Sequence, residues 1–261
     1  MAAEPVRYPR IVRNFIAFGL DQIFFSFNFR FLDAYTILPS FLSQLNVSPI
    51  LIGSLPTING LFWSVPQLIV GGIVGRYPRK KPILLLSLFA RLAAPLLVAV
   101  IYFTQADPAW TSIMTLIVVL MVLAIGDSFV TVAGADLLGR AFPPQRRTGY
   151  VSLWQTVTGT AVIFGVAPLV RYLLGPAGPS FPNNYVSVFL GATICLAIST
   201  LASFFIHEPD LKADETATVH IPWRTFGSHI VQLLRGDVRL RRITVAKMFF
   251  LFAMMASPMY V

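Results

Sequence analysis

Charged side chains are scarce in this sequence. Asp, Glu, Lys and Arg together make up 12% of its 261 residues, whereas hydrophobic residues make up 56%. A soluble domain usually has about 25% charged residues, so this chain has too little polar surface to keep its apolar residues in water. The mean hydropathy of +0.73 agrees with that conclusion. The composition excludes an ordinary soluble globular protein and predicts an integral membrane protein.

Residues that carry catalysis or bind cofactors are scarce as well. The single Cys195 has no second cysteine for an internal disulfide, and the three histidines lack the spacing of a closed metal site. The sequence contains no phosphate-binding loop, no glycine-rich dinucleotide turn and no nucleophile elbow. A lipid-modifying membrane enzyme would need carboxylates, histidines or a metal site converging at one membrane face, and no such set is visible. We therefore expect no cofactor, no metal and no enzymatic activity.

The chain has a net charge of +9, which by itself is compatible with a nucleic-acid partner. The basic residues do not alternate with exposed aromatic residues in a soluble segment, however, so no nucleic-acid partner is expected.

The apolar residues are gathered in long blocks. Several blocks approach or exceed the ~20 residues that a helix needs to cross a ~30 Å hydrocarbon layer. In lipid each backbone polar group needs an internal partner, so these blocks should be helical. The predicted fold is an all-α, polytopic transmembrane helix bundle. Its blocks cover residues 15–44, 50–74, 83–103, 111–138, 150–174 and 185–206, with a further apolar stretch at 243–261.

The polar segments between these blocks define the expected domains and orientation. Lysine and arginine precede the first block and follow the second, the fourth and the sixth. Cytoplasmic loops carry such an excess, which predicts a multi-pass protein of the cell membrane with a cytoplasmic N-terminus. The expected domains are a cytoplasmic segment at 1–14, a six-helix bundle at 15–206, a cytoplasmic linker at 207–242 and the start of a seventh helix at 243–261.

The first block carries a polar stripe. Its members recur at intervals of three, four or seven, which places them on one helix face. Arg30 and Asp33 are spaced to pair along that face. The stripe favours a helix that lines a cavity, and the alternative is an ion pair that locks the helix to a neighbour. Asp21 is interpreted as an interfacial residue near the cytoplasmic end. The stripe consists of Gln22, Ser26, Arg30, Asp33, Ser40 and Gln44.

The second block has a stripe of smaller residues at similar spacing. Small residues on one stripe let two helices approach closely, so we interpret this stripe as a packing surface. Gln67 is the exception and a candidate for the solute pathway. The stripe consists of Gly53, Thr57, Gly60, Ser64, Gln67 and Gly71.

Arg91 and Asp127 are charged residues inside the third and fourth blocks. Charges within a spanning helix are costly and mark functional sites or structural ion pairs. Arg91 can pair with Asp127 or with Asp33, and the sequence does not choose between them.

Residues 71–81, GGIVGRYPRKK, stand between two spanning blocks. This run resembles the signature between helices two and three of major facilitator superfamily transporters. Gly71, Ile73, Arg76, Arg79 and Lys80 match that pattern. Gly75 stands where the family usually has aspartate, and Pro78 stands where it usually has glycine. The loop at residues 142–149, FPPQRRTG, resembles the junction between helices four and five of the same family.

The resemblance implies two six-helix halves, each built of inverted three-helix repeats, with substrate held between them. This chain then supplies the N-terminal half and the start of helix seven, and its partner is the missing C-terminal half. The implied activity is movement of a small-molecule solute across the lipid membrane by alternating access. A buried carboxylate would suit coupling to protons. The alternative is a non-transporting membrane protein, such as an assembly factor or sensor.

Two groups of candidate site residues follow. The substrate or proton pathway comprises Arg30, Asp33, Gln67, Arg91 and Asp127. A cytoplasmic loop that sets topology and gating comprises Gly71, Arg76, Arg79, Lys80, Lys81 and Asp136, and by analogy with the family Arg76 or Arg79 meets Asp136.

Overall fold

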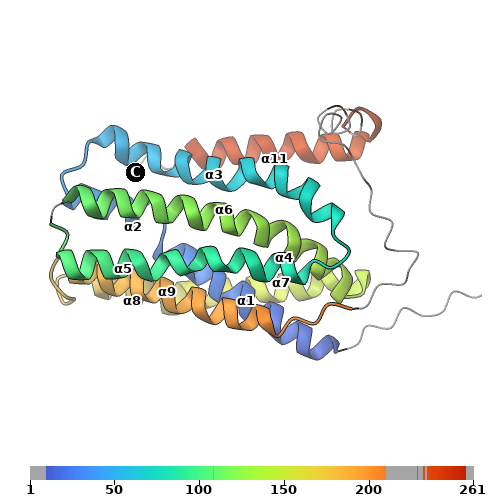
Figure 1. The fold of residues 1–261 in the computed structure, drawn as a ribbon, viewed down its shortest axis with the longest axis horizontal. Helices are drawn as coiled ribbons and strands as arrows, with labels where there is room; N and C mark the ends of the chain where they lie inside the picture. Colours follow the sequence, from blue (N-terminus) through green and yellow to red (C-terminus); the bar gives the residue numbers. More distant parts are fainter. Residues whose placement is uncertain (1–9, 108, 210–227, 229–231, 233, 257–261) are drawn as a thin grey trace, which may run out of the picture. The chain divides into compact units, whose positions relative to one another are not determined.

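The computed structural model describes residues 10–107, 109–209, 228, 232 and 234–256. In this part of the chain the regular elements are helices (Figure 1). Most of the expected N-terminal segment, most of the expected linker and residues 257–261 of the seventh stretch lie outside the described residues. The chain divides into one unit that ends at Thr216 and a second that begins at Ala217.

The first unit contains all six predicted blocks as helices. Several blocks consist of more than one helical segment. The elements are α1 (Ile11–Phe31), α2 (Ile37–Gln44), α3 (Pro49–Arg76), α4 (Lys81–Ser87), η1 (Leu88–Leu92), α5 (Ala93–Thr104), α6 (Ala109–Ala141), α7 (Pro144–Ala161), η2 (Val162–Val166), α8 (Ala167–Leu174) and α9 (Asn183–Phe204).

Five continuous helical stretches among the described residues are long and apolar enough to cross a membrane. They are α3, α4 to α5, α6, α7 to α8, and α9. These stretches confirm the predicted polytopic helical bundle. The helix α1 has 21 residues but is not one of the five. Its polar residues, among them Asp21 and Arg30, lower its hydropathy.

The first block is not the single helix that we predicted. It breaks between Phe31 and Ile37, where α1 ends and α2 begins. At the break, Oδ1 of Asp33 accepts hydrogen bonds from the backbone N–H groups of Tyr35 and Thr36, each at 2.8 Å. Aspartate favours such local bonds over a continued helix because its short side chain reaches the nearby backbone. The break also separates Ser40 and Gln44 from the stripe on α1.

Two other blocks change their helical geometry near the middle. The third block tightens into a 3₁₀ turn at η1, and the fifth widens into a π-helical turn at η2. Departures of this kind within a helix often mark functional positions. Arg91 lies in η1.

Packing between the helices forms two apolar clusters, one towards each end of the bundle. The helix α1 packs along α9, α3 packs along α6, and α4 and α5 pack against α6. The cluster at the basic end includes Phe18, Leu88, Val130 and Ile206. The other cluster includes Phe31, Ala94, Leu123 and Leu196.

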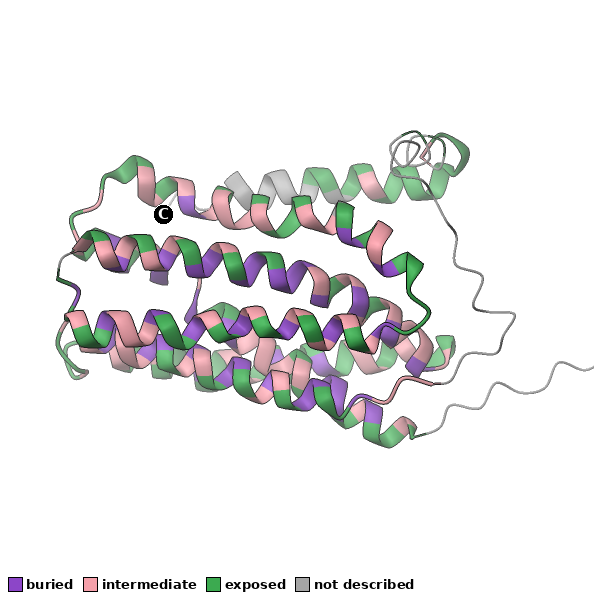
Figure 2. Cartoon of the chain, viewed as in Figure 1, coloured by how far each residue is buried: buried purple, intermediate pink, exposed green. Residues whose placement is uncertain are grey.

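The outer faces of the helices remain apolar. Phe103, Phe164 and Leu86 are 82%, 78% and 70% exposed. Figure 2 shows exposed faces along each helix of the bundle. Large exposed apolar side chains over a whole bundle are typical of a surface that contacts lipid.

The second unit contains α11 (Val238–Ala256). Asp237 precedes it, and its Oδ1 accepts hydrogen bonds from the backbone N–H groups of Arg239 and Leu240 at 2.8 and 3.1 Å. An aspartate in this position satisfies the free N–H groups of the first turn. The helix therefore begins at Val238, within the range that we assigned to the linker.

Candidate functional site

A cluster of charged side chains lies between the two apolar clusters. Asp21 comes from α1, Arg91 from η1 and Asp127 from α6. Each lies in sequence between residues of the two apolar clusters. Arg91 stands ten residues beyond Lys81, which is about 15 Å at a helical rise of 1.5 Å per residue. That depth is about half of a ~30 Å hydrocarbon core, so a membrane surface at Lys81 would place the charge cluster near the midplane.

The guanidinium of Arg91 is the centre of this charge cluster. Its Nε donates to Oδ1 of Asp127 at 3.4 Å. Its Nη1 lies 3.9 Å from Oδ1 of Asp21 and donates to the Oγ of Ser199 at 2.8 Å. The ring of Phe25 lies under the guanidinium, with Cζ 4.8 Å from its centroid. Arg91 and Asp127 are 4% and 5% exposed, so both charges are removed from solvent.

Hydroxyl groups from α9 complete the charge cluster. Ser199 and Ser203 are fully buried, and both donate to Oδ1 of Asp21, Ser203 at 3.1 Å. Ser199 accepts from Arg91 and donates to Asp21, so one hydroxyl joins the guanidinium to the carboxylate. A hydroxyl can play both parts because it has one donor and two acceptor lone pairs.

The composition of the charge cluster leaves a surplus of acidic groups. Two carboxyl groups, Asp21 and Asp127, surround one guanidinium. With all three ionised the charge cluster would carry one net negative charge.

One donor of the charge cluster is unpaired. Nη2 of Arg91 is buried and has no hydrogen-bond partner among the described residues. Such an unpaired donor is costly in a low-dielectric interior, and a water molecule or ligand would satisfy it.

The structure resolves the alternatives that the sequence left open for Arg91, because it pairs with Asp127. Asp33 caps the break after α1, and its predicted pairing with Arg30 is not among the ion pairs of the described residues. Arg30 is exposed. The interpretation of Asp21 as merely interfacial was wrong, because its side chain points into the charge cluster. Its position seven residues before the polar residue Asn28, which is buried, was the signal in the sequence of an inward polar face.

Outside the charge cluster, the stripe of α1 that contains Gln22, Ser26 and Arg30 lies on a different face. Gln22 and Arg30 are exposed, and Ser26 is partly exposed. Ser26 donates to the backbone oxygen of Gln22 at 2.7 Å. Ser40, which we grouped with this stripe, instead lies on α2 and bonds the hydroxyl of Tyr185 at 2.7 Å. The helix α1 thus has an inner polar face and an outer one.

The glycine stripe of α3 is not a packing surface within the described residues. A Cβ added at Gly53, Gly60 or Gly71 would meet nothing within 4 Å. The prediction of close helix packing along this stripe was therefore wrong for the described part of the chain. On the same stripe, Nε2 of Gln67 is buried and has no hydrogen-bond partner there.

A third polar stripe, which we did not predict from the sequence, lies on α7. It comprises exposed residues at helical spacing, which is the pattern that revealed the stripe on α1. Its members are Ser152, Gln155, Thr156, Gly159 and Thr160.

In the predicted cytoplasmic loop between α3 and α4, lysine side chains bind the C-terminal ends of helices. Nζ of Lys80 donates to the backbone oxygens of Val74 and Tyr77, at the end of α3. Nζ of Lys81 donates to the backbone oxygen of Phe204 at 2.9 Å, at the end of α9. Helix C-termini carry unpaired carbonyl groups and partial negative charge, which cations stabilise.

Acidic side chains hold the same loop to α6. Asp136 pairs with Arg140 through two contacts of 2.8 and 3.2 Å, and its Oδ2 lies 3.6 Å from Nζ of Lys80. Burial lowers the pKa of Lys80, and the neighbouring Asp136 carboxylate opposes that shift. The ion pairs of the described residues join Asp136 to Lys80 and Arg140, and the expected pairing with Arg76 or Arg79 stays a prediction.

Glu208 was absent from the predicted site. Its Oε1 and Oε2 accept from the backbone N–H groups of Lys80 and Lys81 at 2.8 and 3.1 Å. Its Oε1 also lies 3.6 Å from Arg140. The carboxylate therefore caps the start of α4, where the helix dipole favours negative charge. It supplies an acidic group to the loop in which Gly75 replaces the usual aspartate.

The chain was compared with protein families, curated proteins and solved structures. No curated protein matches the chain, and no solved structure matches it. The described residues contain no group of three or more His, Cys, Asp or Glu that could hold a metal ion. The family model of the Major Facilitator Superfamily matches residues 22–261, which covers nearly the whole sequence. The chain therefore belongs to the Major Facilitator Superfamily and is a multi-pass membrane transporter.

Proposed function

We propose that the chain is the N-terminal half of a secondary active transporter, which moves a small solute by alternating access coupled to protons. The basic end of the bundle and the N-terminus face the cytoplasm of a cell membrane, following the distribution of lysine and arginine. The protein acts by transport and not by catalysis. Its missing partner is a C-terminal half of the same protein.

One observation supports the proposal of proton coupling, namely that a buried carboxyl group, Asp127, and a half-buried one, Asp21, flank the single guanidinium of Arg91. A surplus buried charge is strongly unfavourable in a membrane interior. Binding one proton to Asp21 or Asp127 removes the surplus, and release restores it. The Asp21 side chain is 19% exposed and that of Asp127 is 7% exposed, so Asp21 is the more accessible group for exchange.

Coupling also requires that binding of the proton changes the interactions between the helices of the bundle. Arg91 contacts α1, α6 and α9 through the side chains of Asp21, Asp127 and Ser199. When one carboxyl group is protonated, its attraction for the guanidinium is lost and the attraction of the other carboxylate dominates. Protonation therefore changes the forces between these three helices.

The outer polar stripes support a solute path beside the charge cluster. Exposed polar groups occur on α1, α3 and α7, including Arg30, Ser64 and Gln155. Polar groups on spanning helices face a protein interior or a watery cavity and avoid lipid. A second half that covers these stripes would enclose such a cavity, and Gln67 would offer a hydrogen-bonding group to the solute.

The test uses the protein encoded by the complete reading frame. This protein is reconstituted into vesicles that contain a pH-sensitive dye. Candidate solutes are added outside, and proton movement is followed by the dye. We expect a solute-dependent signal that Asp21→Asn and Asp127→Asn abolish. Asp107→Asn is the matched control, because Asp107 is an exposed carboxylate in the loop between α5 and α6.

The outcomes separate the proposal from its rival. Solute movement that continues unchanged in both charge-cluster variants would remove the charge cluster from the coupling mechanism. A reading frame without a second set of spans, together with no solute movement, would favour a non-transporting assembly factor or sensor.

A further inference from the structure

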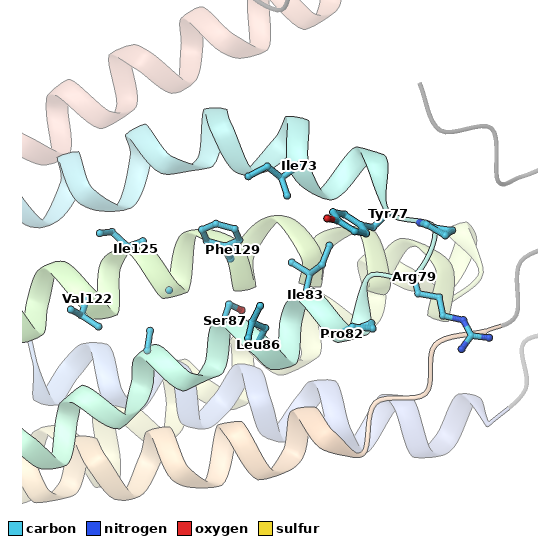
Figure 3. Close-up of a pocket in the computed structure, with 13 residues that line it drawn as sticks. Ile73, Tyr77, Arg79, Pro82, Ile83, Leu86, Ser87, Val122, Ile125 and Phe129 are labelled. Carbon is cyan, nitrogen blue, oxygen red and sulfur yellow. The ribbon is translucent and has the colours of Figure 1, made fainter. Parts of the chain in front are cut away.

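An apolar groove runs along the bundle between α3, α4 and α6 (Figure 3). Its volume is about 760 Å³, and Ile83, Leu86, Ile125 and Phe129 are among the side chains that line it. It contains none of the groups of the charge cluster. The groove is therefore separate from the proposed proton site.

The groove owes its shape to a close helix contact. A Cβ added at Gly126 would lie 2.2 Å from Cβ of Ala90 and 3.1 Å from the backbone oxygen of Ser87. These three residues all line the groove. The absence of a side chain at Gly126 lets the third block pack closely against α6 along one side of the groove.

One end of the groove reaches the basic loop. Tyr77 and Arg79 line the groove, and Arg79 lies at its end in Figure 3. Arg76 and Arg79 are exposed, whereas Lys80 in the same loop is buried against helix ends. The two lysines of this loop thus stabilise the bundle, and the two arginines lie at the surface.

The depth of the groove corresponds to one leaflet of a bilayer. Ala90 stands nine residues beyond Lys81, which is about 14 Å along the helix axis at 1.5 Å per residue. One leaflet contributes about half of a ~30 Å hydrocarbon core. An acyl chain that begins at the level of the basic loop can therefore follow the groove to Ala90.

We infer that this groove binds an anionic phospholipid, with an acyl chain between α3, α4 and α6 and the headgroup phosphate at Arg79. The apolar lining fits the chain, and the positive charge at the end fits the headgroup. Basic pockets at the cytoplasmic ends of transmembrane helices bind such headgroups, and arginine matches phosphate in charge and geometry.

The experiment is native mass spectrometry of the chain, purified in detergent and titrated with phosphatidylglycerol or with phosphatidylcholine. We expect tighter binding of phosphatidylglycerol. Arg79→Gln should weaken its binding about fivefold, because one cationic side chain near the headgroup is lost. Arg146→Gln is the matched control, since Arg146 is an exposed arginine in the other basic loop.

A second pair of variants tests the acyl-chain part of the site. Ile125→Trp adds bulk to a side chain that lines the groove and is 38% exposed. Val118→Trp adds at least as much bulk to α6 two turns away, at a residue that is 55% exposed and outside the lining. We expect Ile125→Trp to reduce the binding of both lipids and Val118→Trp to leave it unchanged. A thermal unfolding scan confirms that each variant is folded.

Three results would overturn the inference. They are equal binding of the two lipids, equal loss in Arg79→Gln and Arg146→Gln, and unchanged binding in Ile125→Trp. The last result would also be expected if another protein segment fills the groove.

Discussion

Removing the positive charge of Arg91 should damage the protein far more than removing either carboxylate beside it. In Arg91→Gln, Asp21 and Asp127 would remain buried without their cation. Breaking a buried ion pair by removing one partner costs about 3–5 kcal/mol of unfolding free energy. For a protein of this size about 1 kcal/mol shifts the unfolding temperature by about 2–4 °C. The expected decrease is therefore ~6–20 °C.

Asp127→Asn should behave differently. Arg91 keeps Asp21 at 3.9 Å and its hydrogen bond to Ser199 at 2.8 Å, and the surplus negative charge is gone. We expect a loss below about 1 kcal/mol, comparable to one net hydrogen bond. The double variant Arg91→Gln with Asp127→Asn should recover part of the stability lost in Arg91→Gln, because one of the two uncompensated carboxylates is removed.

The chain carries its own probe for this measurement. Cys195 is the single cysteine, and it is buried in α9 at 7% exposure. A dye that fluoresces on reaction with a thiol will report unfolding when Cys195 becomes accessible, without any engineered label. If Arg91→Gln and Asp127→Asn unfold at the same temperature, the charge count that underlies the proposed proton site is wrong.

Three further predictions concern residues that stabilise the bundle outside the charge cluster. Gly126→Val should destabilise the bundle by about 1–3 kcal/mol through overpacking against Ala90, whereas Gly134→Ala, whose nearest neighbour atom lies at 3.8 Å, should be near neutral in the same thiol assay. Glu208→Gln should speed amide hydrogen exchange at the start of α4, since the charge at the helix N-terminus is lost, and an unchanged exchange rate there would contradict the capping role. Asp33→Ala should cost about 1 kcal/mol by removing the acceptor at the helix break, whereas Asp33→Asn keeps an acceptor oxygen and should cost less. Equal unfolding temperatures for the two would argue against that hydrogen-bonding role.

The sequence predicted the spans well because lipid imposes a simple rule on them. An apolar stretch of sufficient length must be helical, so composition alone located the five helical stretches that are long and apolar enough to cross a membrane. It failed at Asp33, where a local hydrogen bond competes with the helix over a few residues. Hydropathy averages over a window and does not detect a single side chain that satisfies two backbone N–H groups.

The charge cluster was only partly predictable. Arg91 and Asp127 stood out because charges are rare within spans, but their pairing depends on which helices are neighbours. Asp21 was not predicted to belong to the site, because we placed it near the cytoplasmic end of the first block and interpreted it as a residue of the membrane interface. Its burial results from the packing of α1 along α9, which brings Ser199 and Ser203 to it. These contacts join residues about 180 positions apart, and no local pattern contains them.

The two polar faces of α1 have different consequences for mechanism. The inner face holds Asp21 in contact with Arg91, and the outer face presents Gln22 and Arg30 on the exposed side. A solute bound at the outer face would touch α1 without entering the charge cluster. A proton bound at the inner face would change the attraction between Arg91 and α1. Because one helix carries both faces, a tilt of α1 on protonation would also move the outer residues, and in the proposed mechanism this would couple the two sites without direct contact between solute and proton.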